Sequence, residues 1–215
     1  LTKDGEIEYS LCKRLPVVGS HDSRIMIRSI DFDADGNTTE IELSGNPVKF
    51  LQGHNLFGSS DLLNLMYETI LKISYNLGAT QPSNVLRQIQ DGFYTVSRVD
   101  INRMFSLKNR AQVLSFINVM ASNSRTKAHS SVMKGQTVYL NHDSKRWSIK
   151  LYSKGQEISL PRNNKQGGFI MPPELISWAD NKIRIELTLK SKELIQTGLN
   201  LASKWRMMEE LHIFT

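Results

Sequence analysis

The chain has 215 residues, of which 40% are hydrophobic, and a formal net charge of +6 at pH 7. A chain of this length and hydrophobic content can bury its own core, which argues against intrinsic disorder. Its single cysteine, Cys12, excludes an intrachain disulfide framework and a cysteine-rich zinc site, and is typical of a reducing intracellular compartment. Neither an apolar run of about 18 residues nor an apolar leader is present, so we expect no membrane span and no export signal.

Positive charge is concentrated between Arg103 and Lys154, where ten lysines and arginines are opposed by one acidic residue, Asp143. This segment carries +9, so the remainder of the chain carries −3. A basic surface of this kind favours a polyanionic partner, because each neutralised phosphate releases condensed counterions. We therefore expect nucleic acid as the partner. The alternative is a solvated basic face that only aids solubility.

Hydrophobic alternation predicts a strand over 24–28 and another around Ile41 and Leu43, joined by an Asp- and Gly-rich turn over 31–37. The same stretch matches the EF-hand calcium-loop spacing, with the ligand positions and the glycine at Asp31, Asp33, Asp35, Gly36 and Glu42. Both flanks alternate as strands, so a hairpin turn without calcium is the preferred interpretation. Glu42 is kept as a reserve metal ligand.

Helical spacing of apolar residues predicts helices over 60–77, 82–90 and 109–121, the last capped by Asn109. Two-residue alternation predicts strands over 93–102, 136–141, 147–153 and 182–190, and the middle two form a hairpin. A short helix near Glu174 and helical C-terminal segments complete the pattern. Hairpins mixed with helices, without βαβ repetition, favour an α+β fold with a mainly antiparallel central sheet and helices on one face.

Three of these strands separate polar from apolar side chains on opposite faces. If they share one sheet, its polar face gathers a tyrosine, two carboxylates and several cations: Tyr152, Asp100, Glu186, Arg98, Lys150, Lys154 and Arg184. A polar face turned to water is the ordinary alternative. The mixture of groups instead favours metal-assisted phosphoryl transfer.

Tyrosine, with an ordinary pKa near 10, is a weak nucleophile at pH 7 and needs cations and a polarised phosphate. Lys150 and Lys154 are expected to stabilise its phenolate. Asp100 and Glu186 offer the oxygen ligands that Mg²⁺ or Mn²⁺ prefers, and His54 can complete the shell. A structural hydrogen-bonding role for His54 is the alternative.

The segment 47–58 resembles the Pro-x-Lys-x-Leu-Gln-Gly-His-Asn signature of the filamentous-phage replication initiators, the gene II and gene X class of rolling-circle endonucleases. Segment 97–100 resembles the family's Ser-Arg-Ile-Asp strand, and 183–186 resembles its Arg-x-Glu strand. Segments 137–141 and 149–157 are similar to the hairpin that carries the family's nucleophilic tyrosine. The resemblance runs in order over about 4–199 and implies an HUH-endonuclease or Rep-like fold, although the sequence lacks the His-hydrophobe-His pair of better-known Rep proteins.

The resemblance implies that Tyr152 nicks a replication origin, forming a 5′-phosphotyrosyl link and a free 3′-hydroxyl, with Lys154 assisting. It implies Asp100, Glu186 and His54 as ligands of Mg²⁺ or Mn²⁺. It implies origin DNA, double- and single-stranded, as the partner, contacted by basic side chains: Lys150, Arg98, Arg184, Arg146, Lys145, Arg125 and Lys127. Host helicase and polymerase are further expected partners, in the cytoplasm of a bacterial host. The alternative function is a non-catalytic DNA-binding regulator of phage replication.

We expect a nicking domain over 1–199 and a C-terminal helical segment over 200–215 that continues into a further region. The chain lacks an initial methionine, and the family's first strand and helix precede Leu1. We therefore expect a fragment in which one edge of the sheet is open.

Overall fold

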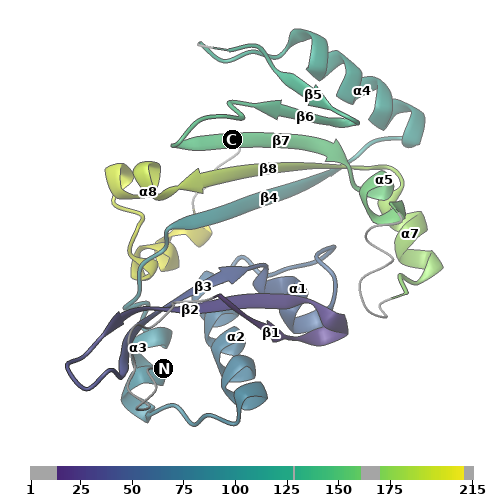
Figure 1. Cartoon of the computed structure of the whole chain (residues 1–215). Helices are drawn as coiled ribbons and strands as arrows, with labels where there is room; N and C mark the ends of the chain where they lie inside the picture. Colours follow the sequence, from purple (N-terminus) through teal and green to yellow (C-terminus); the bar gives the residue numbers. More distant parts are fainter. Residues whose placement is uncertain (1–13, 128, 161–169, 211–215) are drawn as a thin grey trace, which may run out of the picture. The chain divides into compact units, whose positions relative to one another are not determined.

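The computed structural model describes residues 14–127, 129–160 and 170–210, and it divides into two compact units (Figure 1). Unit 1 runs through Gly58 and includes Leu65–Gln81, whereas unit 2 comprises Ser59–Asn64 and the chain from Pro82 onward. No helix in these described ranges is long and apolar enough to cross a membrane. Each unit has its own sheet and its own core.

Unit 1 contains a three-stranded antiparallel sheet in the order β1-β2-β3. Its strands are β1 (Leu15–Val18), β2 (Arg24–Phe32) and β3 (Thr38–Gly45), and a short 3₁₀ turn, η1 (Ser20–Asp22), joins the first two. The sheet is followed by α1 (Pro47–Gln52) and by α2 (Leu62–Leu77), whose later turns belong to this unit. In its buried core, the strands pack against the two helices through Val17, Ile25, Phe50 and Ile73.

The predicted hairpin of unit 1 is confirmed. The carboxylate of Asp33 closes the turn by accepting hydrogen bonds from the backbone N–H groups of Asp35, at 3.0 Å, and Asn37, at 2.8 Å. Glu42 lies in β3, where it forms an ion pair with Arg14 at 3.2 Å and another with Arg28. Both flanks of the loop are strands, so the EF-hand's helices are not present there, and turn formation accounts for the spacing of the acidic residues.

Unit 2 contains a five-stranded antiparallel sheet in the order β4-β8-β7-β6-β5 (Figure 1). The strands are β4 (Arg98–Ser106), β5 (Val132–Lys134), β6 (Thr137–Leu140), β7 (Trp147–Ser153) and β8 (Lys182–Lys190). The helical segments are α3 (Ser83–Gln90), α4 (Arg110–Asn123), α5 (Lys154–Ser159), α7 (Pro173–Ala179), α8 (Ser191–Thr197) and the 3₁₀ segment η2 (Ala202–Glu210). The predicted α+β class and antiparallel sheet are confirmed, and the arrangement is consistent with an HUH-endonuclease or Rep-like fold.

Helix α4 covers the apolar face of this sheet. It begins at the predicted cap, where the Asn109 side chain accepts a 3.0 Å hydrogen bond from the backbone N–H of Gln112. Its Ile117 packs with Leu151 of β7 and Ile183 of β8 in one buried cluster. A second cluster, towards β4, includes Leu63, Val96, Leu194, Ala202 and Trp205. The segment after residue 200 therefore contributes to the core of unit 2.

The strand predicted over 93–102 differs from the structure, because β4 begins only at Arg98. The residues before it pair with the C-terminal segment instead: the N–H of Val96 donates to the carbonyl of Asn200 at 2.7 Å, and Tyr94 accepts from Ala202 at 3.0 Å. Gly92 permits this approach, since a Cβ there would lie 2.5 Å from the backbone nitrogen of Ser203. Alternation along the sequence does not distinguish a strand of the main sheet from an extended segment that pairs with the C-terminal residues.

We expect Ile117→Ala to lower the free energy of unfolding by about 2–5 kcal/mol, because it leaves a cavity beneath the sheet. Ile117 is 1% exposed, whereas Val119 on the same helix is 53% exposed. Val119→Ala is therefore the matched control, with an expected change within about 0.5 kcal/mol. Chemical denaturation measures both. Equal losses in the two variants would contradict the packing of α4 on the sheet.

Candidate active site

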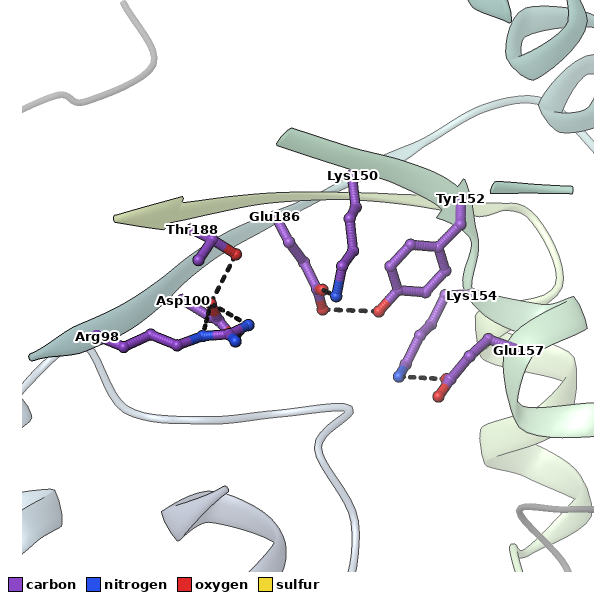
Figure 2. Close-up of polar contacts among 8 residues, drawn as sticks. All are labelled: Arg98, Asp100, Lys150, Tyr152, Lys154, Glu157, Glu186 and Thr188. Atoms are coloured by element: carbon purple, nitrogen blue, oxygen red, sulfur yellow. Dashed lines mark hydrogen bonds and ion pairs between the residues drawn. The ribbon is translucent and has the colours of Figure 1, made fainter. Parts of the chain in front are cut away.

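The register of β4, β8 and β7 builds the polar face of the unit 2 sheet. Since strand side chains alternate, residues paired across these strands share one face. The polar pairs are Asp100 with Thr188, Asn102 with Glu186, Lys150 with Glu186, and Tyr152 with Arg184. Figure 2 shows the labelled side chains of these strands extending to the same side. The predicted gathering of Tyr152 with two carboxylates and several cations on one face is thus what this structure shows.

Tyr152 is held by a carboxylate. Its hydroxyl donates a 2.7 Å hydrogen bond to Oε1 of Glu186, while Lys150 Nζ lies 3.8 Å from Oε2 of the same carboxylate (Figure 2). Burial raises the pKa of Tyr152 above its ordinary value, the Glu186 carboxylate raises it further, and the Arg184 guanidinium opposes them. The hydroxyl is therefore protonated at neutral pH, and stabilisation of a phenolate by the neighbouring lysines is not seen in this arrangement.

Lys154 lies just beyond β7 and not within the strand. The strand ends at Ser153, whose side chain caps α5 by accepting a 3.3 Å hydrogen bond from the backbone N–H of Gln156. Lys154 is therefore the first residue of a helix, and it is fully buried. Its Nζ donates to Oε2 of Glu157 at 2.6 Å, on the same side of the ribbon as Tyr152 in Figure 2. A catalytic role for Lys154 stays a prediction.

Asp100 forms the second carboxylate centre of the face. Its Oδ1 accepts a hydrogen bond from the Thr188 hydroxyl at 2.7 Å, and its two oxygens accept three from the Arg98 guanidinium, each at 3.2 Å. Thr188 is buried, and the alternation of its strand places it on this face. Thr188 was not predicted as a site residue. Its hydroxyl orients the carboxylate of Asp100, which was predicted.

Arg184 is a buried cation of the face, with 3% of its surface exposed. One terminal nitrogen donates a 2.8 Å hydrogen bond to Oδ1 of Asn102, which pairs with Glu186 across the strands. Asn102 was also not selected from the sequence, although its alternation with Arg98 and Asp100 places it on the polar face. The sequence pattern shows on which face of the sheet Thr188 and Asn102 lie, but not which side chains they contact.

The other predicted DNA contacts lie outside the β4-β8-β7 face. Arg146 and Lys145 are exposed in the turn before β7, and Arg146 forms a 2.6 Å ion pair with Glu193. Arg125 and Lys127 are exposed on the loop between α4 and β5. Exposed cations on such loops can approach a phosphate backbone. Their DNA contacts stay a prediction.

His54 lies in unit 1, just after α1, whereas Asp100 and Glu186 belong to unit 2. Its Nδ1 is 3.4 Å from the side-chain nitrogen of Gln52, and its ring makes an edge contact with Phe57. Participation of His54 in one metal shell with Asp100 and Glu186 therefore stays a prediction.

Asp100 and Glu186 fit a divalent cation by the chemistry of their oxygen atoms. They lie on adjacent strands and on the same face, and hard ions such as Mg²⁺ and Mn²⁺ prefer such ligands. Each carboxylate already pairs with a cation, Arg98 or Lys150, so a metal ion would compete with that side chain. Within the described ranges no three His, Cys, Asp or Glu residues cluster as a metal site.

Comparison with known proteins places this chain in a family. A family model for the N-terminal region of the replication-associated protein encoded by phage gene II matches residues 1–208. The replication-associated protein of this type from Enterobacteria phage I2-2 is 35% identical over 209 residues, covering 94% of this chain and 59% of that protein. The same-named protein of Enterobacteria phage M13 is 26% identical over 179 residues, covering 75% of this chain and 42% of that protein. No solved structure matches.

The chain thus spans less than two thirds of the length of these curated relatives. The matches confirm the resemblance to the filamentous-phage replication initiators. That resemblance was indicated by segment 47–58 and by the hairpin segments 137–141 and 149–157. The chain belongs to the family of phage gene II replication-associated proteins, and it matches that family's N-terminal region.

Proposed function

We propose that this chain is a DNA strand transferase that uses Tyr152 to nick a phage replication origin and start rolling-circle replication. The observation that carries the proposal is the 2.7 Å hydrogen bond from the Tyr152 hydroxyl to Glu186, on a sheet face that also holds cations. The family name supports a role in replication. The proposed setting is the cytoplasm of a bacterial host, with origin DNA, helicase and polymerase as partners.

The proposed reaction begins when the Tyr152 oxygen attacks the phosphorus of one backbone phosphodiester. A bond forms between this oxygen and phosphorus, and the bond from phosphorus to the 3′-oxygen breaks. The tyrosine proton passes to Oε1 of Glu186, which already accepts its hydrogen bond. The departing 3′-oxygen takes a proton from solvent and becomes the hydroxyl that primes synthesis. A base is needed because the pKa of Tyr152 is raised by burial, so little phenolate exists at pH 7.

Cations on the same face support this step. Lys150 Nζ lies 3.8 Å from Oε2 of Glu186, so its positive charge stands next to the proposed base. Asp100 and Glu186 would hold Mg²⁺ or Mn²⁺, which when bound supplies Lewis-acid polarisation of the phosphate.

The exposed basic loops would bind the DNA backbone without reading sequence. A DNA-binding regulator that does not cut would use the same cations, so covalent capture of DNA separates the two functions.

We expect Tyr152→Phe to abolish nicking and leave DNA affinity nearly unchanged, because it removes one hydroxyl and no cation. A labelled origin oligonucleotide, incubated with Mn²⁺ and separated by denaturing electrophoresis, measures nicking, and fluorescence anisotropy measures affinity. Tyr139→Phe, on the adjacent strand β6, is the matched control and should nick normally. Nicking by Tyr152→Phe at the normal rate would eliminate this tyrosine as the nucleophile.

We expect the pH dependence of nicking to reveal Glu186 as the proton acceptor. The wild-type rate should vary little between about pH 7 and 9, because the carboxylate removes the tyrosine proton. In Glu186→Gln the rate should be lower and should rise about tenfold per pH unit, since hydroxide must then remove a proton from a tyrosine whose pKa is raised. Single-turnover rates give both profiles. Parallel profiles for the two proteins would show that Glu186 is not the base.

We expect Asp100→Ala to raise the Mn²⁺ concentration for half-maximal nicking by about tenfold or more, as for loss of a metal-site residue. Glu186→Ala should also alter the metal dependence. The exposed Glu174 on α7 supplies the control Glu174→Gln, whose Mn²⁺ titration should match the wild type. If both Asp100→Ala and Glu186→Ala retain the wild-type titration, the metal binds elsewhere.

A further inference from the structure

We propose that the Arg184 guanidinium binds a non-bridging oxygen of the DNA phosphate that Tyr152 attacks, an inference that rests on the nicking function proposed above. The inference concerns one side chain and one phosphate, beyond the general attraction of basic residues for DNA. It makes Arg184 a catalytic residue rather than one of several positioning cations.

The hydrogen bonding of Arg184 is incomplete. Its side chain is 3% exposed, and one terminal nitrogen, Nη2, donates to Asn102 at 2.8 Å. The other two nitrogens, Nε and Nη1, are buried and have no hydrogen-bond partner in the part of the chain that the structure describes. Buried guanidinium donors are normally satisfied, because an unsatisfied buried charge is strongly unfavourable. Such an exception suggests that these donors serve a ligand.

Among the described residues, the charged groups of the face pair in a way that leaves Arg184 without a counterion. Glu186 lies near Lys150, Asp100 pairs with Arg98, and Glu157 pairs with Lys154. No carboxylate of the described residues lies within ion-pairing distance of Arg184. The face therefore has one buried positive charge in excess, which a phosphodiester, with one negative charge, would neutralise.

The position of Arg184 suits the phosphate of this reaction. It is the cross-strand partner of Tyr152, so the two residues are directly opposite on one face. Its Nε and Nη1, which donate from different edges of the guanidinium plane, remain available for a phosphate oxygen. Because these donors are buried, rotation about the side-chain bonds of Arg184 or Tyr152 must accompany phosphate binding. Donors directed at the phosphate would stabilise the charge that builds up in the transition state.

The first test measures the single-turnover rate of adduct formation and DNA affinity in parallel. We expect Arg184→Met to slow adduct formation about 100- to 1000-fold, as for loss of a donor to a transition-state oxyanion. Affinity should fall less than about tenfold, because many other cations contact the backbone. Arg184→Lys should be intermediate, since it keeps the charge and loses the guanidinium donors. Arg87→Met is the control: Arg87 lies on α3 with 85% of its side chain exposed.

A wild-type adduct together with a normal rate in Arg184→Met would overturn this inference and leave the nicking function intact. Absence of any adduct at Tyr152 in the wild type would instead refute the nicking function. Phosphate binding by Arg184 then has to be judged by a readout that needs no cleavage.

The second test therefore measures the melting temperature, Tm, with and without inorganic phosphate. We expect phosphate to raise the Tm of the wild type and not that of Arg184→Met, since a bound ligand stabilises the folded state. Without phosphate, Arg184→Met should melt within about 2–4 °C of the wild type, or higher, because it removes an uncompensated buried charge. A larger fall in Tm, combined with an unchanged response to phosphate, would identify Arg184 as a structural residue. Arg184→Lys repeats the test if the methionine variant does not fold.

Discussion

The alternation of side chains along β7 and β8 is the constraint on which unit 2 depends. On one face, Leu151 and Ile183 pack against α4 in the buried core. On the other, Tyr152 and Arg184 stand opposite each other. A slip of one residue in the pairing would exchange the two sets, exposing the core and burying the charges. The packing that stabilises the sheet therefore also fixes the residues of the candidate site.

The polar face holds its charged groups mostly as pairs. Carboxylates accept hydrogen bonds from Tyr152 and Thr188, and each has a lysine or arginine neighbour of opposite charge. Arg184 differs because its charge has no carboxylate to pair with among the described residues. In the proposed nicking reaction, this excess cation lies next to the nucleophile.

Much of this site follows from local sequence pattern, because period-two alternation in 147–153 and 182–190 determines which side chains share a face. The hairpin of β6 and β7 was predictable from the same alternation, and the cap of α4 from the preference of asparagine for the position before a helix. The start of α5 at Lys154 was not, since Ser153 acts as a cap at the end of an otherwise continuous strand pattern.

Other features depend on contacts between segments far apart in the sequence. Strands β1 and β5 have four and three residues, too few for alternation to be recognised, and exist through pairing with longer partners. The start of β4 depends on pairing with the C-terminal segment. The unpaired donors of Arg184 have no signature in the sequence at all. Grouping His54 with residues of unit 2 requires the placement of two separate units, which periodicity does not give.

Covalent linkage of Tyr152 to DNA can be detected by mass spectrometry of the linked peptide. The wild-type chain would be incubated with a single-stranded origin oligonucleotide and Mn²⁺, then digested with protease and nuclease. The account predicts one peptide spanning β7 that carries a nucleotide on Tyr152. Bound DNA with no modified peptide, or a nucleotide on another residue, would contradict it.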